Sequence, residues 1–157
     1  MYTLKNSITY RGVWSMIMPD TIPTDMFAPC GMNCMVCYRH CVSKKSCGGC
    51  FSNKNGTSEE CRSCRIHACV GEKGIEYCFS CKIFPCKQIK KMDKRYRDRY
   101  DQSLIENGLM AKEQGLAAFL AAERSKWTCG KCEGIISLHD NECSECQTFF
   151  GKKRAGV

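Results

Sequence analysis

Cysteine is the residue type with the clearest chemistry in this sequence, since 16 of its 157 residues are cysteine. A content this high is typical of either a disulfide scaffold or a protein with several metal sites. Residues 1–28 do not have the pattern of a secretory signal peptide, and no stretch is long and apolar enough to span a bilayer. We therefore expect a cytoplasmic protein with no membrane association, in which reduced thiols bind metal.

The most informative spacing lies near the C-terminus, where ten residues separate two CxxC pairs, Cys129-Gly-Lys-Cys132 and Cys143-Ser-Glu-Cys146. Each pair presents two thiolates from one tight turn, and two such turns complete a tetrahedral site around a short hairpin. A redox dithiol of the thioredoxin type would need a βαβ context, which this region lacks. The spacing therefore predicts a zinc ribbon.

Other residues near the cysteines also bear on the predicted metal sites. Glu133 and Gln147 follow the second cysteine of each C-terminal pair, where such turns often have glycine. His139 lies in the loop between the pairs, and we expect it on the surface because four cysteines already complete the site. His40 and His67 lie among the other cysteines. For the same reason we expect these two histidines to be solvated, or to hydrogen-bond near a ligand.

The remaining twelve cysteines lie between residues 30 and 86 and form three further groups of four. One group repeats the ribbon spacing, one falls within twelve consecutive residues, and one ends beside a basic helix. Their spacing suits Zn²⁺ or a [4Fe–4S] cluster, and cysteines of neighbouring groups are close enough to interleave. In that order the groups are Cys47, Cys50, Cys61 and Cys64; Cys30, Cys34, Cys37 and Cys41; and Cys69, Cys78, Cys81 and Cys86.

The segments around the cysteines predict a small metal-stapled protein. Glycines within residues 29–86 indicate turns around ligands rather than long helices or strands. Residues 87–126 are predicted to form a pair of helices, with Pro85 in the first turn and with turns or helix ends at Asn107-Gly108 and Gly115. The expected fold class is an irregular, α-rich cysteine domain with helices, followed by a C-terminal β zinc ribbon.

This pattern divides the chain into five parts. Each part is too small for a hydrophobic core alone to stabilise it, so we expect metal ligation to supply folding energy. The parts are an N-terminal extension (1–28), a cysteine-rich metal-binding domain (29–86), a helical segment (87–126), a zinc ribbon (127–150) and a basic tail (151–157).

The formal net charge of +8 raises the question of a nucleic-acid partner. This value counts every thiol as neutral. Four thiolates around Zn²⁺ or a [4Fe–4S]²⁺ core leave a net charge of about −2, so four such sites would offset the whole excess. We therefore expect the basic run between Lys87 and Arg99 to be counter-charge for the metal sites. A nucleic-acid partner is an alternative that the charge does not support.

The order of the motifs resembles that of a widespread prokaryotic family with a cysteine-rich domain of unknown function. The matching segments are Cys30-Gly-Met-Asn-Cys34-Met-Val-Cys37, Cys47-Gly-Gly-Cys50, Cys61-Arg-Ser-Cys64 and the stretch from Glu72 to Cys86. The resemblance continues through the ribbon cysteines to about residue 150. It implies a cytoplasmic metal-binding protein with these cysteines as ligands, and it implies no particular activity. Cys41 lies where the family pattern need not have cysteine.

Two functions fit these observations. The first is a non-catalytic, zinc-binding module that docks on a protein or RNA partner, because the sequence has no Ser/His/Asp set, phosphate loop or carboxylate pair. Closed four-thiolate sites also leave no open position for a substrate, so we expect no enzymatic activity. The alternative is a [4Fe–4S] redox or electron-transfer protein with a zinc-ribbon appendage, favoured by the cysteine density of residues 30–41. A third reading, thiol chemistry at an uncoordinated cysteine, predicts that a thiol can still be labelled after metal loading.

Overall fold

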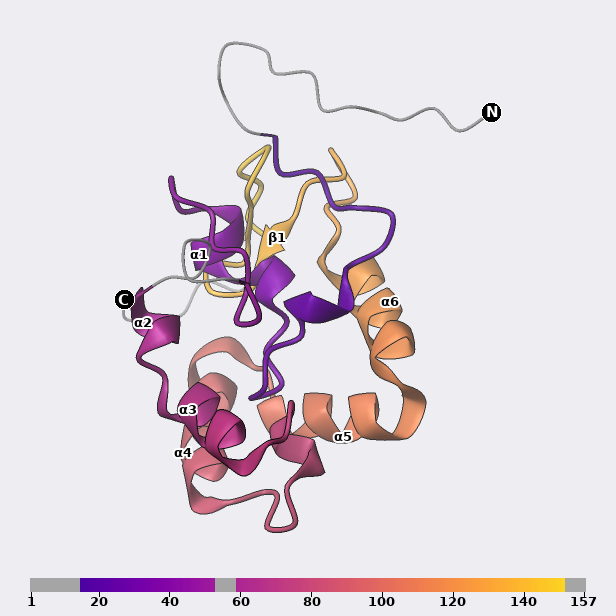
Figure 1. The fold of residues 1–157 in the computed structure, drawn as a ribbon. Helices are drawn as coiled ribbons and strands as arrows, with labels where there is room; N and C mark the ends of the chain where they lie inside the picture. Colours follow the sequence, from indigo (N-terminus) through magenta and orange to yellow (C-terminus); the bar gives the residue numbers. More distant parts are fainter. Residues whose placement is uncertain (1–14, 53–58, 152–157) are drawn as a thin grey trace.

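Figure 1 shows the computed structural model, which describes residues 15–52 and 59–151. The cysteine-rich part contains short helical elements joined by turns, as the glycine spacing predicts. These elements are the 3-10 helices η1 (Thr24–Met26), η2 (Cys34–Val36) and η3 (Cys78–Ser80) and the helices α1 (Tyr38–Cys41), α2 (Glu59–Arg62) and α3 (Arg65–Lys73).

Helix α3 is longer than the sequence predicts for this part of the chain. Its nine residues include Gly71, where an added Cβ would meet no atom within 4 Å. The helix ends at Gly74, which adopts the left-handed conformation with φ +65° and is a typical C-terminal cap. One of the glycines expected to break the helix is therefore tolerated inside it, and another terminates it.

The helical part contains three helices instead of the predicted pair: α4 (Lys87–Tyr100), α5 (Leu104–Gln114) and α6 (Leu116–Trp127). Pro85 precedes α4 instead of lying in its first turn, and Cys86 is the residue at the N-cap. Helix α5 begins with a cap in which Ser103 Oγ accepts a hydrogen bond from the Glu106 N–H at 3.1 Å. Gly115 separates α5 from α6 with φ +90°, which confirms the helix end predicted there.

The turn predicted at Asn107-Gly108 is wrong, because both residues lie inside α5. Both are weak helix formers, so contacts from outside the helix decide their conformation. Asn107 Nδ2 donates a hydrogen bond to the Gly31 carbonyl at 3.0 Å. A Cβ on Gly108 would lie 3.3 Å from the Phe84 ring, so glycine allows the close approach of this ring to the helix.

A short hairpin connects the two C-terminal cysteine pairs, as predicted. Strands β1 (Ile136–Ser137) and β2 (Glu142–Cys143) pair antiparallel, with Ile136 opposite Cys143. Asn141, in the turn between them, has φ +53°, a conformation that asparagine tolerates better than most residues. The hairpin thereby brings the second cysteine pair back towards the first.

Residues 16–18 add to the edge of this ribbon. The Met18 N–H donates to the Glu133 carbonyl at 2.9 Å, and the Ile135 N–H donates to the Met16 carbonyl at 3.0 Å. The predicted N-terminal extension is therefore paired with the ribbon through its described residues, although more than a hundred residues separate the two along the chain.

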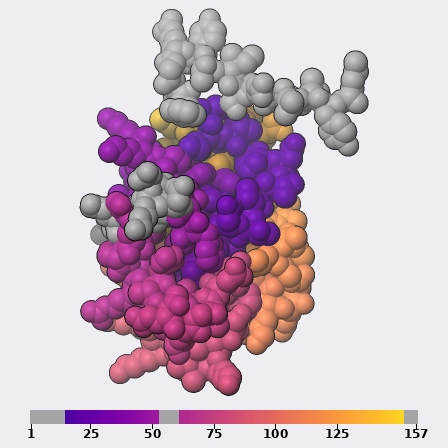
Figure 2. All heavy atoms as spheres, viewed as in Figure 1, coloured from indigo at the N-terminus to yellow at the C-terminus, as the bar shows by residue number. Residues whose placement is uncertain are grey.

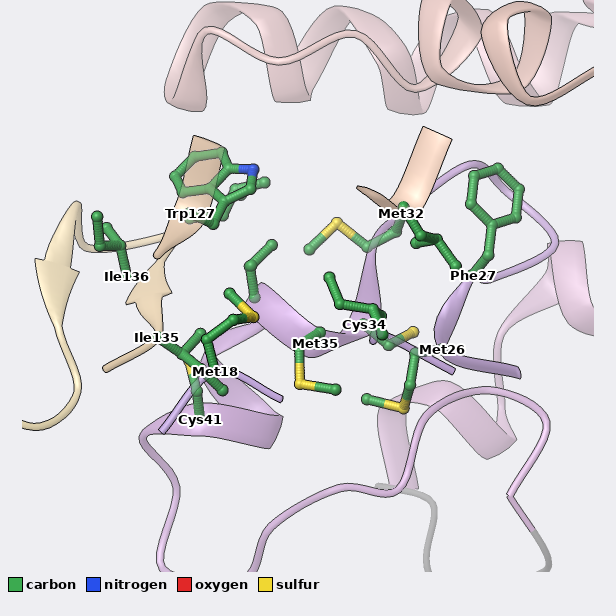
Figure 3. Close-up of a cluster of buried hydrophobic side chains, with 14 of the residues drawn as sticks. Met18, Met26, Phe27, Met32, Cys34, Met35, Cys41, Trp127, Ile135 and Ile136 are labelled. Carbon is green, nitrogen blue, oxygen red and sulfur yellow. The ribbon is translucent and has the colours of Figure 1, made fainter. Parts of the chain in front are cut away.

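One hydrophobic cluster joins the N-terminal segment, the cysteine-rich part, the long helices and the ribbon. Phe27 is fully buried, and its ring contacts those of Tyr77, Phe79 and Phe119 at centroid distances of 5.6, 6.2 and 5.4 Å. Figure 3 shows the buried methionines of this cluster beside Cys34, Cys41 and the ribbon isoleucines. The described chain therefore has an apolar core in addition to its cysteines.

Figure 2 shows that the described N-terminal residues, in indigo, lie between the magenta cysteine-rich part and the orange helix α6. On this face of the molecule the N-terminal segment thus separates the cysteine-rich part from α6.

Among residues 15–52 and 59–151, no helix combines the length and the apolar character needed to cross a bilayer.

Candidate metal centres

The four cysteines of the C-terminal pairs converge on one point. Their sulfur atoms all lie within 4.8 Å of one another; Cys129 Sγ is 3.7 Å from Cys146 Sγ, and Cys132 Sγ is 3.5 Å from Cys143 Sγ. In a tetrahedral site with Zn–S bonds of about 2.3 Å, neighbouring sulfurs are about 3.8 Å apart. Within the described ranges, no other group of three or more His, Cys, Asp or Glu residues meets the 4.8 Å limit. This set of four could therefore hold a metal ion.

Two tight turns position these sulfurs. The Glu133 N–H donates to the Cys129 carbonyl at 2.9 Å, and the Gln147 N–H donates to the Cys143 carbonyl at 3.0 Å. Glu133 and Gln147 both have positive φ, +63° and +59°. The turns thus keep the conformation that glycine adopts most easily, although these two positions hold longer side chains.

Hydrogen bonds and burial make the thiols of this site unequal acids. Hydrogen bonds from Thr148 lower the pKa of Cys146 to about 6. Burial raises the pKa of Cys132 to about 12, and it raises the pKa of Cys143 as well. A bound cation must displace protons from thiols whose pKa is raised, so metal affinity rises with pH. Thr148 could not be identified from the sequence, because its only signal is its place two residues after Cys146.

His139 lies outside the four-cysteine group. Its Nδ1 accepts a hydrogen bond from the Tyr38 N–H at 3.2 Å, and its ring packs edge-on against Tyr96 and Tyr100 at centroid distances of 6.0 and 4.8 Å. Burial lowers the pKa of His139. The side chain is half-buried and links three parts of the fold, so the expectation of a surface histidine is wrong.

All sixteen cysteines lie in the described ranges, and no disulfide bond joins any two of them there. In the N-terminal part, Cys34 Sγ lies 4.0 Å from Cys50 Sγ, which joins two groups that the spacing kept apart. The hydrogen bond with Cys34 raises the pKa of Cys50. Burial, and then the nearby thiols of Cys50 and Cys64, raise the pKa of Cys30. These contacts connect cysteines of the first two groups, and the way in which those eight cysteines divide into sites stays a prediction.

Cys41 has different surroundings. It is 4% exposed, it lies in the hydrophobic cluster (Figure 3), and its Sγ donates to the Cys37 carbonyl at 3.3 Å. Burial raises the pKa of Cys41 to about 12. These are the contacts of a protonated core thiol, and the ligand role of Cys41 stays a prediction. His40 Nδ1 lies 2.6 Å from the Cys47 carbonyl oxygen, which fits the expected hydrogen bond near a ligand.

The last group of four cysteines lines a single cavity. Cys69 lies on α3, Cys78 begins η3, Cys81 follows η3 as its C-cap, and Cys86 caps α4. Burial, followed by the thiols of Cys86, Cys69 and Cys81, raises the pKa of Cys78 to about 12. Lys73 Nζ donates to Cys81 Sγ at 3.7 Å. Lys73 could not be identified from the sequence, because only the turn after α3 brings it close to Cys81.

Comparison with known proteins supports the resemblance for part of the chain. Residues 26–91 match the model of a family described as "Protein of unknown function (DUF3795)". The match covers less than half of the chain; it includes all twelve N-terminal cysteines and leaves the ribbon outside. No curated protein and no solved structure shows a significant match.

Proposed function

We propose that this protein is a zinc-binding module in which Cys129, Cys132, Cys143 and Cys146 hold one structural Zn²⁺. The observation that carries the proposal is the 3.5–3.7 Å separation of paired sulfurs, close to the value for tetrahedral zinc thiolate. Four thiolates fill the coordination sphere and leave no position for water or substrate. The ion is therefore proposed to act in folding and not in catalysis.

The zinc content of two variants tests this proposal. We expect Cys143→Ser to contain about one Zn²⁺ fewer per chain than the parent protein, because it removes a buried ligand. Ser144→Ala is the matched control, since it loses a hydrogen bond to the Ile135 carbonyl but keeps all four thiols. In the parent, Co²⁺ in place of Zn²⁺ should give the thiolate charge-transfer absorption of a tetrahedral site.

Two results would contradict the zinc proposal. One is a parent protein whose ribbon takes up neither Zn²⁺ nor Co²⁺ under reducing conditions. The other is a Cys143→Ser variant that folds and has the same zinc content as the parent. The Co²⁺ spectrum of the parent does not depend on the folding of any variant, so the proposal stays testable if Cys143→Ser is unstable.

We further propose that the module docks on a protein partner through the end of the ribbon. Phe149 and Phe150 are each 47% exposed there, and Phe149 pairs with Glu142 of β2. Exposed neighbouring aromatic side chains are typical of protein interfaces. A photo-crosslinking residue at position 150 should give a discrete adduct in cells, whereas one at the exposed position Lys112 should not. Equal labelling from both positions would contradict this surface.

A further inference from the structure

The cavity lined by Cys69, Cys78, Cys81 and Cys86 differs from the ribbon site in its size. Its volume is about 40 Å³, whereas one water molecule needs roughly 10–15 Å³ measured in this way. The cavity therefore has more room than one closely held ion would need. All four cysteines of the group line it, and they come from three successive segments of the chain.

The sulfur spacing in this cavity also differs from that of the ribbon. The ribbon thiols lie within 4.8 Å of one another, but no three of the four cavity cysteines meet this limit in the described chain. All four residues nevertheless line the same cavity. Four cysteines spread around one open volume suit a group larger than a single ion. An iron–sulfur cubane has this property, because sulfide and iron lie between its four thiolate ligands.

The walls of the cavity suit a cluster with net negative charge. The other lining side chains are apolar (Val70, Ile75, Ile83 and Phe84), apart from Lys73. The Lys73 amine donates to Cys81 Sγ, the kind of hydrogen bond to a ligand sulfur that tunes cluster potentials. Cys86 lies at the N-terminus of α4, a fourteen-residue helix whose dipole favours a thiolate there.

We propose that Cys69, Cys78, Cys81 and Cys86 bind a [4Fe–4S] cluster, separate from the zinc ion of the ribbon. With every iron bound to a cysteine, such a cluster can accept and release one electron but has no open iron for a substrate. The inference does not depend on the zinc proposal, because the two sites share no ligand. It assigns the apolar cavity that α3 forms with residues 75–86 to a redox-active or structural cluster.

The first experiment counts iron and sulfide in the full chain, purified without oxygen and reconstituted with Fe²⁺ and sulfide. The Cys81→Ala variant should contain about four iron and four sulfide fewer than the parent. Cys143→Ser should keep the parent's iron and sulfide and lose only zinc. The parent should have a broad visible absorption that bleaches with dithionite. This absorption should be weaker in Cys81→Ala.

The second experiment changes the surroundings of the cluster and keeps all four ligands. Lys73→Gln removes a positive charge next to Cys81, so we expect a more negative reduction potential with unchanged iron content. Lys112→Gln is the matched control, because this exposed lysine on α5 does not line the cavity. A role of Lys73 in folding alone would not move the potential.

Three results would overturn the cluster proposal. The first is a reconstituted parent that holds zinc but no iron or sulfide. The second is a folded Cys81→Ala variant with the parent's iron and sulfide content. The third is a Lys73→Gln variant whose potential equals those of the parent and of Lys112→Gln. The third result needs no change to a ligand, so it is informative even if Cys81→Ala fails to fold.

Discussion

At the scale of single residues, Gly134 controls how closely the backbone approaches the zinc ligands. A Cβ at this position would lie 2.7 Å from Cys143 Sγ and 2.9 Å from the Glu145 side chain. Overpacking of this kind costs about 1–3 kcal/mol, which corresponds to a loss of roughly fivefold to 150-fold in zinc affinity if the strain falls on the site. We expect Gly134→Ala to weaken zinc binding by that amount in competition with a chromophoric chelator.

Gly130 provides the control for this prediction. It lies in the first CxxC turn of the same ribbon, and a Cβ there would meet no atom within 4 Å. Gly130→Ala should therefore bind zinc with nearly the affinity of the parent. If the two variants had equal affinities, the close approach at Gly134 would have no energetic consequence and the packing argument would be wrong.

Glu133 tests the second feature of these turns, their left-handed backbone. Its φ of +63° costs roughly 1 kcal/mol for a residue with a Cβ, and glycine removes that cost. We expect Glu133→Gly to raise the unfolding free energy of the zinc-loaded protein by up to about 1 kcal/mol. Lys131→Gly, at an exposed position of the same turn with no positive φ, should lower it by about 0.5–1 kcal/mol. Thermal unfolding would refute the idea if both variants shifted in the same direction.

The sequence predicts the residues of these sites only where their contacts are local. The CxxC pairs identify the ribbon ligands because each pair acts through its own local turn. Thr148 and Lys73 depend on where the chain folds back, so their spacing in the sequence says little about their contacts with Cys146 and Cys81. For the same reason, the spacing in the sequence does not show that Cys34 lies beside Cys50.

At the scale of elements, a buried carboxylate joins helix α6 to the loop before the first cysteine helix, η2. Glu123 is 6% exposed, and its Oε2 accepts hydrogen bonds from Trp127 Nε1 at 2.9 Å and from Asn33 Nδ2 at 3.2 Å. Asn33 in turn caps η2 by accepting a hydrogen bond from the Met35 N–H at 3.1 Å. The loop that carries Cys34 is thereby held against α6.

We expect Glu123→Ala to lower the unfolding free energy by about 2–4 kcal/mol, because it leaves two buried donors without an acceptor. Glu123→Gln should cost less, since its amide oxygen can still accept one of these hydrogen bonds. Glu113→Ala, at an exposed position on α5, should stay within about 0.5 kcal/mol of the parent. Urea denaturation measures all three, and similar values for the Glu123→Ala and Glu113→Ala variants would contradict this role.

Helices and strands could be predicted where the residues that determine them are close together in the sequence. The ribbon hairpin follows from its cysteine spacing, and the end of α5 follows from Gly115. The continuity of α5 could not be predicted, because it depends on residues distant in the sequence. Asn107 hydrogen-bonds to Gly31, and Gly108 packs closely against Phe84. The pairing of residues 16–18 with the ribbon is also a long-range contact that no local pattern indicates.

At the scale of the whole molecule, the basic helix α4 shares its charge between internal ion pairs and the cysteine-rich part. Within the helix, Lys94 pairs with Asp98 at 2.7 Å and Arg97 pairs with the buried Asp93 at 2.8 Å. Other cations of the run line a cavity beside Cys64, together with Arg65 of α3: Lys87, Lys91 and Arg95. Positive charge next to cysteine thiols is the arrangement that the counter-charge argument expects.

His139 connects the ribbon to both α1 and α4, and its ionisation should couple the stability of the whole molecule to pH. Its Nδ1 can accept from the Tyr38 N–H only while the ring is unprotonated at that nitrogen. Burial lowers the pKa of His139 below the value of about 6.5 expected in the unfolded chain. The unfolded state therefore binds more protons in this window, so the stabilisation is complete above about pH 6.5 and is lost as the pH falls through the folded-state pKa.

His139→Asn isolates this contribution, because asparagine keeps an acceptor near the position of Nδ1 but does not titrate. As the pH falls from roughly 7.5 to roughly 5.5, the parent should lose stability relative to His139→Asn, by at most about 1.4 kcal/mol per pH unit. Protons also compete for the thiolates, so zinc content must be measured in both proteins at each pH and compared only where it is equal. Parallel stability curves for the two proteins would mean that the contacts of His139 with Tyr38, Tyr96 and Tyr100 tolerate its charge.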